Sequence, residues 1–270
     1  MPPVRHLGTM PPVDPSTPGR RVFLLIALQL ALTACGSAAG DPTLTSRPDD
    51  LFVSAAASLT DAFAEVGSAV EEANPGVRVL LNLGSSSSLR QQILEGAPVD
   101  VFASADTANM AQIVESGETA ADPEIFARNT MQIAFPAGNP AGITGLGDFA
   151  DEDLLIGLCA ATAPCGAHAR EVLENAGVIP SIDSNEPDVR ALLNKVGSGE
   201  LDAGIVYQTD VLSSGDVEGL AIPDDVNVIA DYPIAVIVNG SHPMAGSRFV
   251  EFVLSEGGQA ILNRYGFSSP

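Results

Sequence analysis

The sequence is poor in positive charge and in aromatic side chains. Its 270 residues include one lysine, Lys195, and no tryptophan, and 34 acidic residues against 12 basic ones give a formal net charge of −22. This charge excludes nucleic acids and anionic lipid head groups as partners for the body of the chain, because like charges repel. A site for an anion would therefore have to be built from neutral hydrogen-bond donors and helix ends.

Cysteine is also scarce, and the first of its three copies belongs to the N-terminal segment. Arg20 and Arg21 precede the apolar run 22–32, and small residues then lead to Cys35. This pattern is typical of an export signal that is cut before a lipidated cysteine. The sequence predicts a lipoprotein signal peptide over residues 1–34, a tether over 35–50 and anchoring to the outer face of the cell membrane. An uncleaved anchor helix and an ordinary signal peptide with a chance cysteine are the alternatives.

The other two cysteines, Cys159 and Cys165, lie close together in the chain. In an exported protein, such a pair favours a local disulfide. Metal ligation with the nearby His168 is the alternative, but one cysteine pair gives it little support.

Small and hydroxyl-bearing residues recur where an apolar strand gives way to a helix. Ser58 follows the strand 51–53, Ser86 and Ser87 follow the strand 77–83, and Cys165 follows the apolar run 154–158. At a fourth such turn, Asp188 is placed as the N-cap of a helix that begins at Val189. The first amides of a helix have no partner within it, so each of these turns can offer N–H donors to an anion.

Strands and helices alternate almost throughout residues 51–270, which predicts an α/β protein with mostly parallel sheets. Strand-like segments at 226–230 and 234–238 flank Tyr232, and two helices, at about 247–254 and 257–265, close the chain. No repeat of solenoid length is present in the sequence, and no linker within 51–270 is long enough to separate independent domains.

Several motifs occur in an order that resembles the molybdate-binding component of ABC importers, the ModA family. They are 55–60 (AAASLT), 85–89 (SSSSL), 96–100 (GAPVD), 164–166 (PCG), 188–190 (DVR), 204–207 (GIVY) and 264–267 (RYGF). The resemblance covers essentially all of residues 51–270. It implies a periplasmic-binding-protein-like fold of type II, in which a ligand cleft separates two α/β lobes. Lobe one would hold residues 51–131 and 231–270, and lobe two would hold residues 132–230.

The resemblance also implies a set of ligand-binding residues. These are Ser58 and Ser86 in lobe one, and Cys165, Val189 and Tyr207 in lobe two. Cys165 departs from the family, which often has alanine there, but only its main-chain amide would bind. The metal would arrive as the molybdate or tungstate oxyanion, with no cofactor, and the partners would be the permease and ATPase subunits of an importer. The protein would act as a monomer and would not be an enzyme.

Other functions remain open from the residues alone. Sulfate fits a site made only of donors, whereas phosphate carries a proton and needs an acceptor. Asp61 lies close to Ser58 in the sequence and Arg190 follows Val189, so a phosphate site remains open. The three tyrosines are too dispersed for a ferric-ion site.

A serine hydrolase is disfavoured because neither Ser58 nor Ser86 lies in a G-x-S-x-G motif, and His168 and His242 are predicted to lie on the surface. A structural lipoprotein would bind no small ligand.

Overall fold

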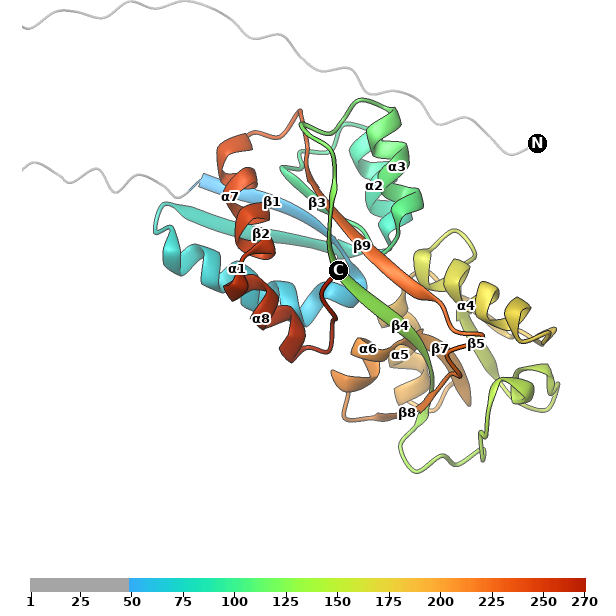
Figure 1. Cartoon of the computed structure of the whole chain (residues 1–270). Coiled ribbons are helices and arrows are strands. Elements are labelled where there is room, and N and C mark those ends of the chain that lie inside the picture. The colour runs from blue at the N-terminus through green and yellow to red at the C-terminus, as the bar shows by residue number, and fades with distance from the viewer. Residues whose placement is uncertain (1–48) are drawn as a thin grey trace, which may run out of the picture. The chain divides into compact units, whose positions relative to one another are not determined.

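Two long strands, β4 (Glu124–Pro136) and β9 (Ile229–Val236), run side by side through the middle of the molecule and connect its two halves (Figure 1). The computed structural model describes residues 49–270, which belong to one compact unit. The predicted signal peptide, Cys35 and nearly all of the predicted tether lie outside the described residues. Within residues 49–270, no helix has the length and hydrophobicity needed to cross a membrane.

The remaining elements alternate along the chain as predicted. The other strands are β1 (Asp49–Ala56), β2 (Val77–Gly84), β3 (Val101–Ala103), β5 (Ile156–Cys159), β6 (Ser184–Glu186), β7 (Ala203–Tyr207) and β8 (Val217–Ala221). The helices are α1 (Thr60–Ala73), α2 (Ser86–Leu94), α3 (Thr107–Glu115), α4 (Pro164–Asn175), α5 (Val189–Gly197), α6 (Gln208–Leu212), α7 (Pro243–Leu254) and α8 (Glu256–Arg264), with 3-10 turns η1 (Ala57–Leu59) and η2 (Leu146–Ala150).

The strands form one continuous path in the order β2-β1-β3-β9-β4-β7-β5-β6, and β8 pairs with β4. We call β1 to β3 with α1, α2, α3, α7 and α8 lobe one, and β5 to β7 with α4, α5 and α6 lobe two. The pairs β1–β2, β1–β3, β5–β6 and β5–β7 are parallel, but every pair that includes β4 or β9 is antiparallel. The prediction of mostly parallel sheets was therefore wrong for the strands that connect the lobes.

The helices bury one face each, as their apolar spacing predicts. In α1 the buried positions Phe63, Val66 and Val70 recur every three or four residues. Phe63 packs against Phe126 of β4 and Phe249 of α7, with ring centroids 5.7 and 5.8 Å apart. These contacts join α1 and α7 to a connecting strand, so the C-terminal segment of the chain packs into the core of lobe one.

Several segments differ from the elements that the sequence predicts, and three of them involve the strands β1, β8 and β9. Strand β1 begins at Asp49, so the last two residues of the predicted tether belong to a strand. Strand β8 was not predicted. The two segments expected around Tyr232 form one strand, β9, which includes Pro233. Proline cannot donate to a ladder, and the partner strand has a register shift between Ile125 and Ala127, opposite that proline.

Candidate functional site

A single small cavity, with about 10 Å³ of room inside it, is lined by all of the residues predicted to bind a ligand. Ser58 and Ser86 reach it from lobe one, and Cys165, Val189 and Tyr207 reach it from lobe two. The other lining residues are small or lie in the turns between a strand and a helix: Ala56, Ala57, Gly84, Ser85, Ala105, Pro164 and Asp188. Sites for drug-sized molecules measure roughly 300–1,000 Å³, so this cavity suits a small ion.

On the side of lobe one, two serines lie at the ends of neighbouring parallel strands. Ser58 lies in η1, between β1 and α1, and Ser86 is the first residue of α2, just after β2. Both are buried, with exposed fractions of 5% and 1%. The Ser86 Oγ accepts a hydrogen bond from the amide of Ala105 at 3.0 Å. The Ser58 Oγ lies 2.9 Å from the hydroxyl of Tyr232 in β9.

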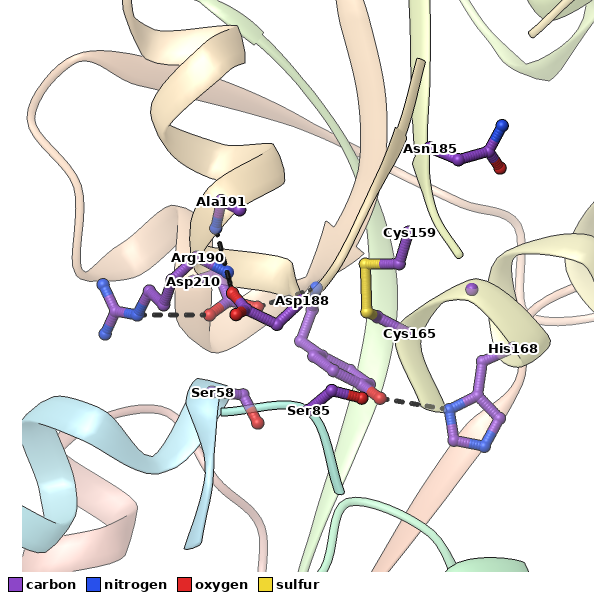
Figure 2. The surroundings of a disulfide bond; sticks show 12 residues. Ser58, Ser85, Cys159, Cys165, His168, Asn185, Asp188, Arg190, Ala191 and Asp210 are labelled. Atoms are coloured by element: carbon purple, nitrogen blue, oxygen red, sulfur yellow. Dashed lines mark hydrogen bonds and ion pairs between the residues drawn. A yellow bond between two sulfur atoms is a disulfide. The ribbon is translucent and has the colours of Figure 1, made fainter. Parts of the chain in front are cut away.

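On the side of lobe two, the cavity meets the first turns of α4 and α5. The Asp188 carboxylate caps α5 by accepting from the amides of Arg190 and Ala191, at 2.9 and 3.0 Å (Figure 2). The cap engages those two amides and not that of Val189, the first residue of the helix, which lines the cavity. In α4, Pro164 occupies the first turn, where its missing N–H costs no hydrogen bond.

Cys159 and Cys165 form the predicted disulfide, which joins the end of β5 to the first turn of α4 (Figure 2). The next residue, Gly166, lies against the main chain of the preceding turn: a Cβ there would lie 2.0 Å from the carbonyl oxygen of Ala160. Only glycine fits at this position. The disulfide and this close approach together fix the turn that carries the Cys165 amide.

Tyr207 ends strand β7 and is 1% exposed. Burial raises its pKa well above the usual value, as do the nearby Tyr232 and Asp106, so its hydroxyl keeps its proton. Its oxygen lies 3.2 Å from the Nδ1 atom of His168, on α4 (Figure 2). The prediction that His168 lies on the surface was wrong: burial lowers its pKa and favours the neutral ring, although Asp106 and Glu171 oppose the shift.

Asp61 and Arg190, which kept a phosphate site open, do not line the cavity. They form an ion pair with each other across the two lobes. The Arg190 Nε atom also lies 3.9 Å from the carboxylate of Asp210, which is buried and accepts a hydrogen bond from the Tyr207 amide at 3.1 Å. Burial raises the pKa of Asp210 to about 7, and the Arg190 charge opposes that rise.

Asp210 and Tyr232 were not predicted to take part in the site, although both lie directly behind the lining residues. Asp210 follows Tyr207 by three residues, which is the spacing of an acidic side chain that reaches back to the start of a helix. That spacing could have identified it. Tyr232 lies 174 residues from Ser58, so no local pattern in the sequence links the two.

The cavity presents hydrogen-bond donors and almost no charge. Asp188 supplies the only carboxylate among the lining residues, and its Oδ1 atom is engaged by the α5 amides; no lysine or arginine lines the cavity. Within residues 49–270, no group of three or more His, Cys, Asp or Glu side chains is placed to hold a metal ion. The arrangement is therefore suited to an anion whose atoms all accept hydrogen bonds.

Similar proteins were found for nearly the whole chain. It is 38% identical over 259 residues to the molybdate-binding protein ModA of Mycobacterium tuberculosis, covering 93% of this chain and 98% of that one. Identity to the molybdate-binding protein ModA of Escherichia coli is 31% over 229 residues, with 81% and 88% covered.

Solved structures show the same fold. The periplasmic molybdate-binding protein of Azotobacter vinelandii superposes with a TM-score of 0.72 at 19% identity, over 82% of this chain and 99% of that one. The sulfate-binding protein SubI of Mycobacterium tuberculosis superposes with a TM-score of 0.74 at 16% identity, over 82% and 86%. The predicted periplasmic-binding-protein fold of two α/β lobes is thus confirmed.

A family model described as bacterial extracellular solute-binding protein matches residues 51–268. The members of this family bind solutes and are not enzymes, which removes the hydrolase alternative. The chain therefore belongs to the bacterial extracellular solute-binding proteins and, within them, to the ModA family that its motifs predict.

Proposed function

We propose that this protein captures molybdate, and also tungstate, between its two lobes and delivers it to the permease of an ABC importer. The observation that carries the proposal is the convergence of Ser58, Ser86, Cys165, Val189 and Tyr207 on one small cavity. Its relatives in Mycobacterium tuberculosis and Escherichia coli bear the name of molybdate-binding proteins. In this proposal molybdate is the transported ligand, and the protein has no cofactor.

The chemistry of the cavity supports a fully ionised oxyanion. Such an anion accepts hydrogen bonds on every oxygen and donates none, so it matches a lining of hydroxyl and amide donors. The α2, α4 and α5 helices direct their N-termini at the cavity, and their dipoles favour negative charge without a counter-cation. Molybdate and tungstate share these properties and have nearly the same size.

The pairing of Asp61 with Arg190 weighs against phosphate. At neutral pH phosphate carries a proton and needs an acceptor in its site, but the only lining carboxylate is the helix cap Asp188. Sulfate carries no proton and remains the second candidate, because a sulfate-binding protein has the same fold. Sulfate is smaller than molybdate, so the size of the closed cavity distinguishes them.

In this proposal, lobe one spans residues 51–131 and 231–270 and lobe two spans 132–230, and both close on the anion about β4 and β9. Ligand contacts from the two lobes stabilise the closed form, which the permease recognises. The protein works as a monomer on the outer face of the membrane, held by a lipid on Cys35.

Calorimetric titration of the purified protein with molybdate, tungstate, sulfate and phosphate tests the proposal. We expect one-to-one binding of molybdate and tungstate, and responses to sulfate and phosphate at least tenfold weaker, which corresponds to about 1.4 kcal/mol. Tight binding of sulfate would retain the fold and change the ligand. No response to any of the four anions would overturn the proposal.

A further inference from the structure

We propose that Tyr232 and Asn129 are positioning residues that direct the proton of the Ser58 hydroxyl into the cavity. Neither residue lines the cavity, and both belong to the strands that connect the lobes. The inference rests on the proposed function, since it assigns a task to residues behind one of its donors.

The Ser58 hydroxyl has a polar neighbour that does not line the cavity, the hydroxyl of Tyr232, at 2.9 Å. A hydroxyl has one proton, so only one of the two groups donates in this bond. If Tyr232 donates, the Ser58 proton is free to point at a ligand; if Ser58 donates, it offers the ligand a lone pair. The direction of this single bond therefore decides whether Ser58 attracts or repels an anion.

Asn129 fixes that direction from the other side of Tyr232. Its Oδ1 atom accepts from the amide of Thr130 at 3.0 Å, so the amide group has one orientation. The Nδ2 atom then donates to the Thr209 hydroxyl at 2.8 Å and, in a longer bond of 3.5 Å, to the Tyr232 hydroxyl. Because Tyr232 faces an N–H group there, its own proton is left for the Ser58 hydroxyl, at 2.9 Å, or for the Tyr207 hydroxyl. Tyr207 already has His168 as a partner, so we assign the Tyr232 proton to Ser58.

Burial makes this order of donors costly to reverse. Tyr232 is 0% exposed, Asn129 is 3% exposed and Thr209 is 4% exposed, so water is not at hand to replace a lost partner. Burial also raises the pKa of Tyr232, and nearby Asp210 adds to the rise, while its hydrogen bonds with Ser58, Asn129 and Tyr207 oppose it; the hydroxyl stays protonated. The phenol therefore always has a proton that it can donate to Ser58.

The second serine of lobe one, Ser86, also accepts a hydrogen bond from a group behind it, and the direction of this bond cannot reverse. The Ser86 Oγ accepts from the main-chain amide of Ala105, which can only donate. Its proton is therefore free to face the cavity. Lobe one thus sets both serine hydroxyls as donors, one through a backbone amide and the other through the Asn129–Tyr232 pair.

A double-mutant cycle tests the inference. Tyr232→Phe keeps the ring packed between Phe126 and Phe267 but removes the donor behind Ser58. We expect this change to weaken molybdate binding about three- to tenfold in the wild-type protein. In a Ser58→Ala background, Tyr232→Phe should have no further effect, because there is no hydroxyl left to orient.

Two further variants complete the design. Asn129→Leu removes the same orienting donor at similar volume, and its effect on molybdate binding should also vanish in the Ser58→Ala background. Tyr265→Phe is the matched control, because it removes a phenol hydroxyl that does not line the cavity, and its affinity should equal that of the wild type. Thermal unfolding checks that each variant is folded.

The outcomes separate the inference from the proposed function. If the wild type binds no molybdate, both are wrong. If the wild type binds but Tyr232→Phe and Asn129→Leu weaken binding equally with and without the Ser58 hydroxyl, their role is structural and only the inference is wrong. The inference is also wrong if Tyr232→Phe binds molybdate like the wild type.

Discussion

Three of the hydroxyls that line the cavity each have a hydrogen-bond partner outside it. Ser58 contacts Tyr232, Ser86 accepts from Ala105, and Tyr207 contacts His168. Such partners hold a hydroxyl in one orientation before a ligand arrives, which lowers the entropy cost of binding. The residues behind the lining are therefore part of the site, although they would touch no ligand.

Removing any one of these hydroxyls should weaken molybdate binding and leave the fold intact. Ser58→Ala, Ser86→Ala and Tyr207→Phe each delete one hydrogen bond to a charged ligand, worth about 1.5 to 3 kcal/mol. Titration calorimetry should show affinities roughly ten- to 150-fold below the wild type. Ser116→Ala is a control, because that hydroxyl donates to Ile113 in lobe one and does not line the cavity. Wild-type affinity in all three variants would contradict the site.

Asp210 should make stability depend on pH. Its pKa is raised to about 7 in the folded protein, so between about pH 4 and 7 the folded state holds more protons than the unfolded state. Its contribution to stability is therefore fully present below about pH 4 and is lost as the pH rises through 7.

Asp210→Asn removes this titration and keeps an oxygen for the Tyr207 amide. Urea unfolding at about pH 4.5 and about pH 8 measures the effect. Relative to the wild type, the variant should gain stability at the higher pH, by at most about 1.4 kcal/mol for each unit of pKa difference. An equal stability difference at both pH values would show that the folded and unfolded pKa values of Asp210 are the same.

At the scale of elements, the first turn of α4 combines a disulfide, a proline and a close glycine contact. The disulfide closes a loop between residues six apart. It lowers the conformational entropy of the unfolded chain, which stabilises the folded state by roughly 2 kcal/mol. It also holds the turn that presents the Cys165 amide.

Removing the bridge should therefore lower both stability and affinity. The double variant Cys159→Ser with Cys165→Ser avoids a stray thiol and keeps both main-chain amides. We expect a lower free energy of unfolding and weaker molybdate binding, and reduction of the wild type should give the same loss together with two new titratable thiols. Unchanged affinity after complete reduction would show that the turn is held without the disulfide.

Arg190, on α5 of lobe two, contacts residues of lobe one at the start of α1. Its guanidinium pairs with Asp61 and lies 3.4 Å from the carbonyl oxygen of Ala57 in lobe one. In lobe two it donates to the Ser213 hydroxyl at 3.2 Å. The contacts with Asp61 and Ala57 exist only while the lobes are together, so they stabilise that arrangement.

Arg190→Gln and Asp61→Asn should weaken molybdate binding without changing its selectivity. Partly exposed ion pairs contribute about 0.2–1 kcal/mol, so we expect an effect of at most about fivefold that shrinks at high salt. Arg78→Gln is the matched control, because Arg78 pairs with Asp50 within lobe one at 2.7 Å. If this control weakens binding as much as Arg190→Gln does, the effect does not come from the lobe contact.

At the scale of the whole molecule, the proposed anchoring depends on one residue outside the described structure. If Cys35 is the lipidated first residue of the mature protein, Cys35→Ala should block lipidation and move the protein from the membrane fraction to the soluble fraction. Immunoblotting of fractionated cells and the mass of the mature N-terminus measure this. Membrane association of the variant at the wild-type level would favour an uncleaved anchor helix.

The sequence by itself determined the local features of this protein. Apolar spacing predicted nearly all the helices, the Asp188 cap follows from its place before α5, and the spacing of Cys159 and Cys165 favoured their disulfide. Each of these depends on residues close together in the chain, where geometry is set by a few torsion angles. The ordered motifs then indicated the family and its five cavity residues.

Only the tertiary structure decided which residues far apart in the chain contact each other. Ser58 with Tyr232, and Asp61 with Arg190, are separated by 174 and 129 residues, and no pattern in the chain links them. The antiparallel pairing of β4 with β9 likewise arises because both strands pass between the lobes. Such contacts depend on how whole elements pack, because residues far apart in sequence meet only after the chain has folded.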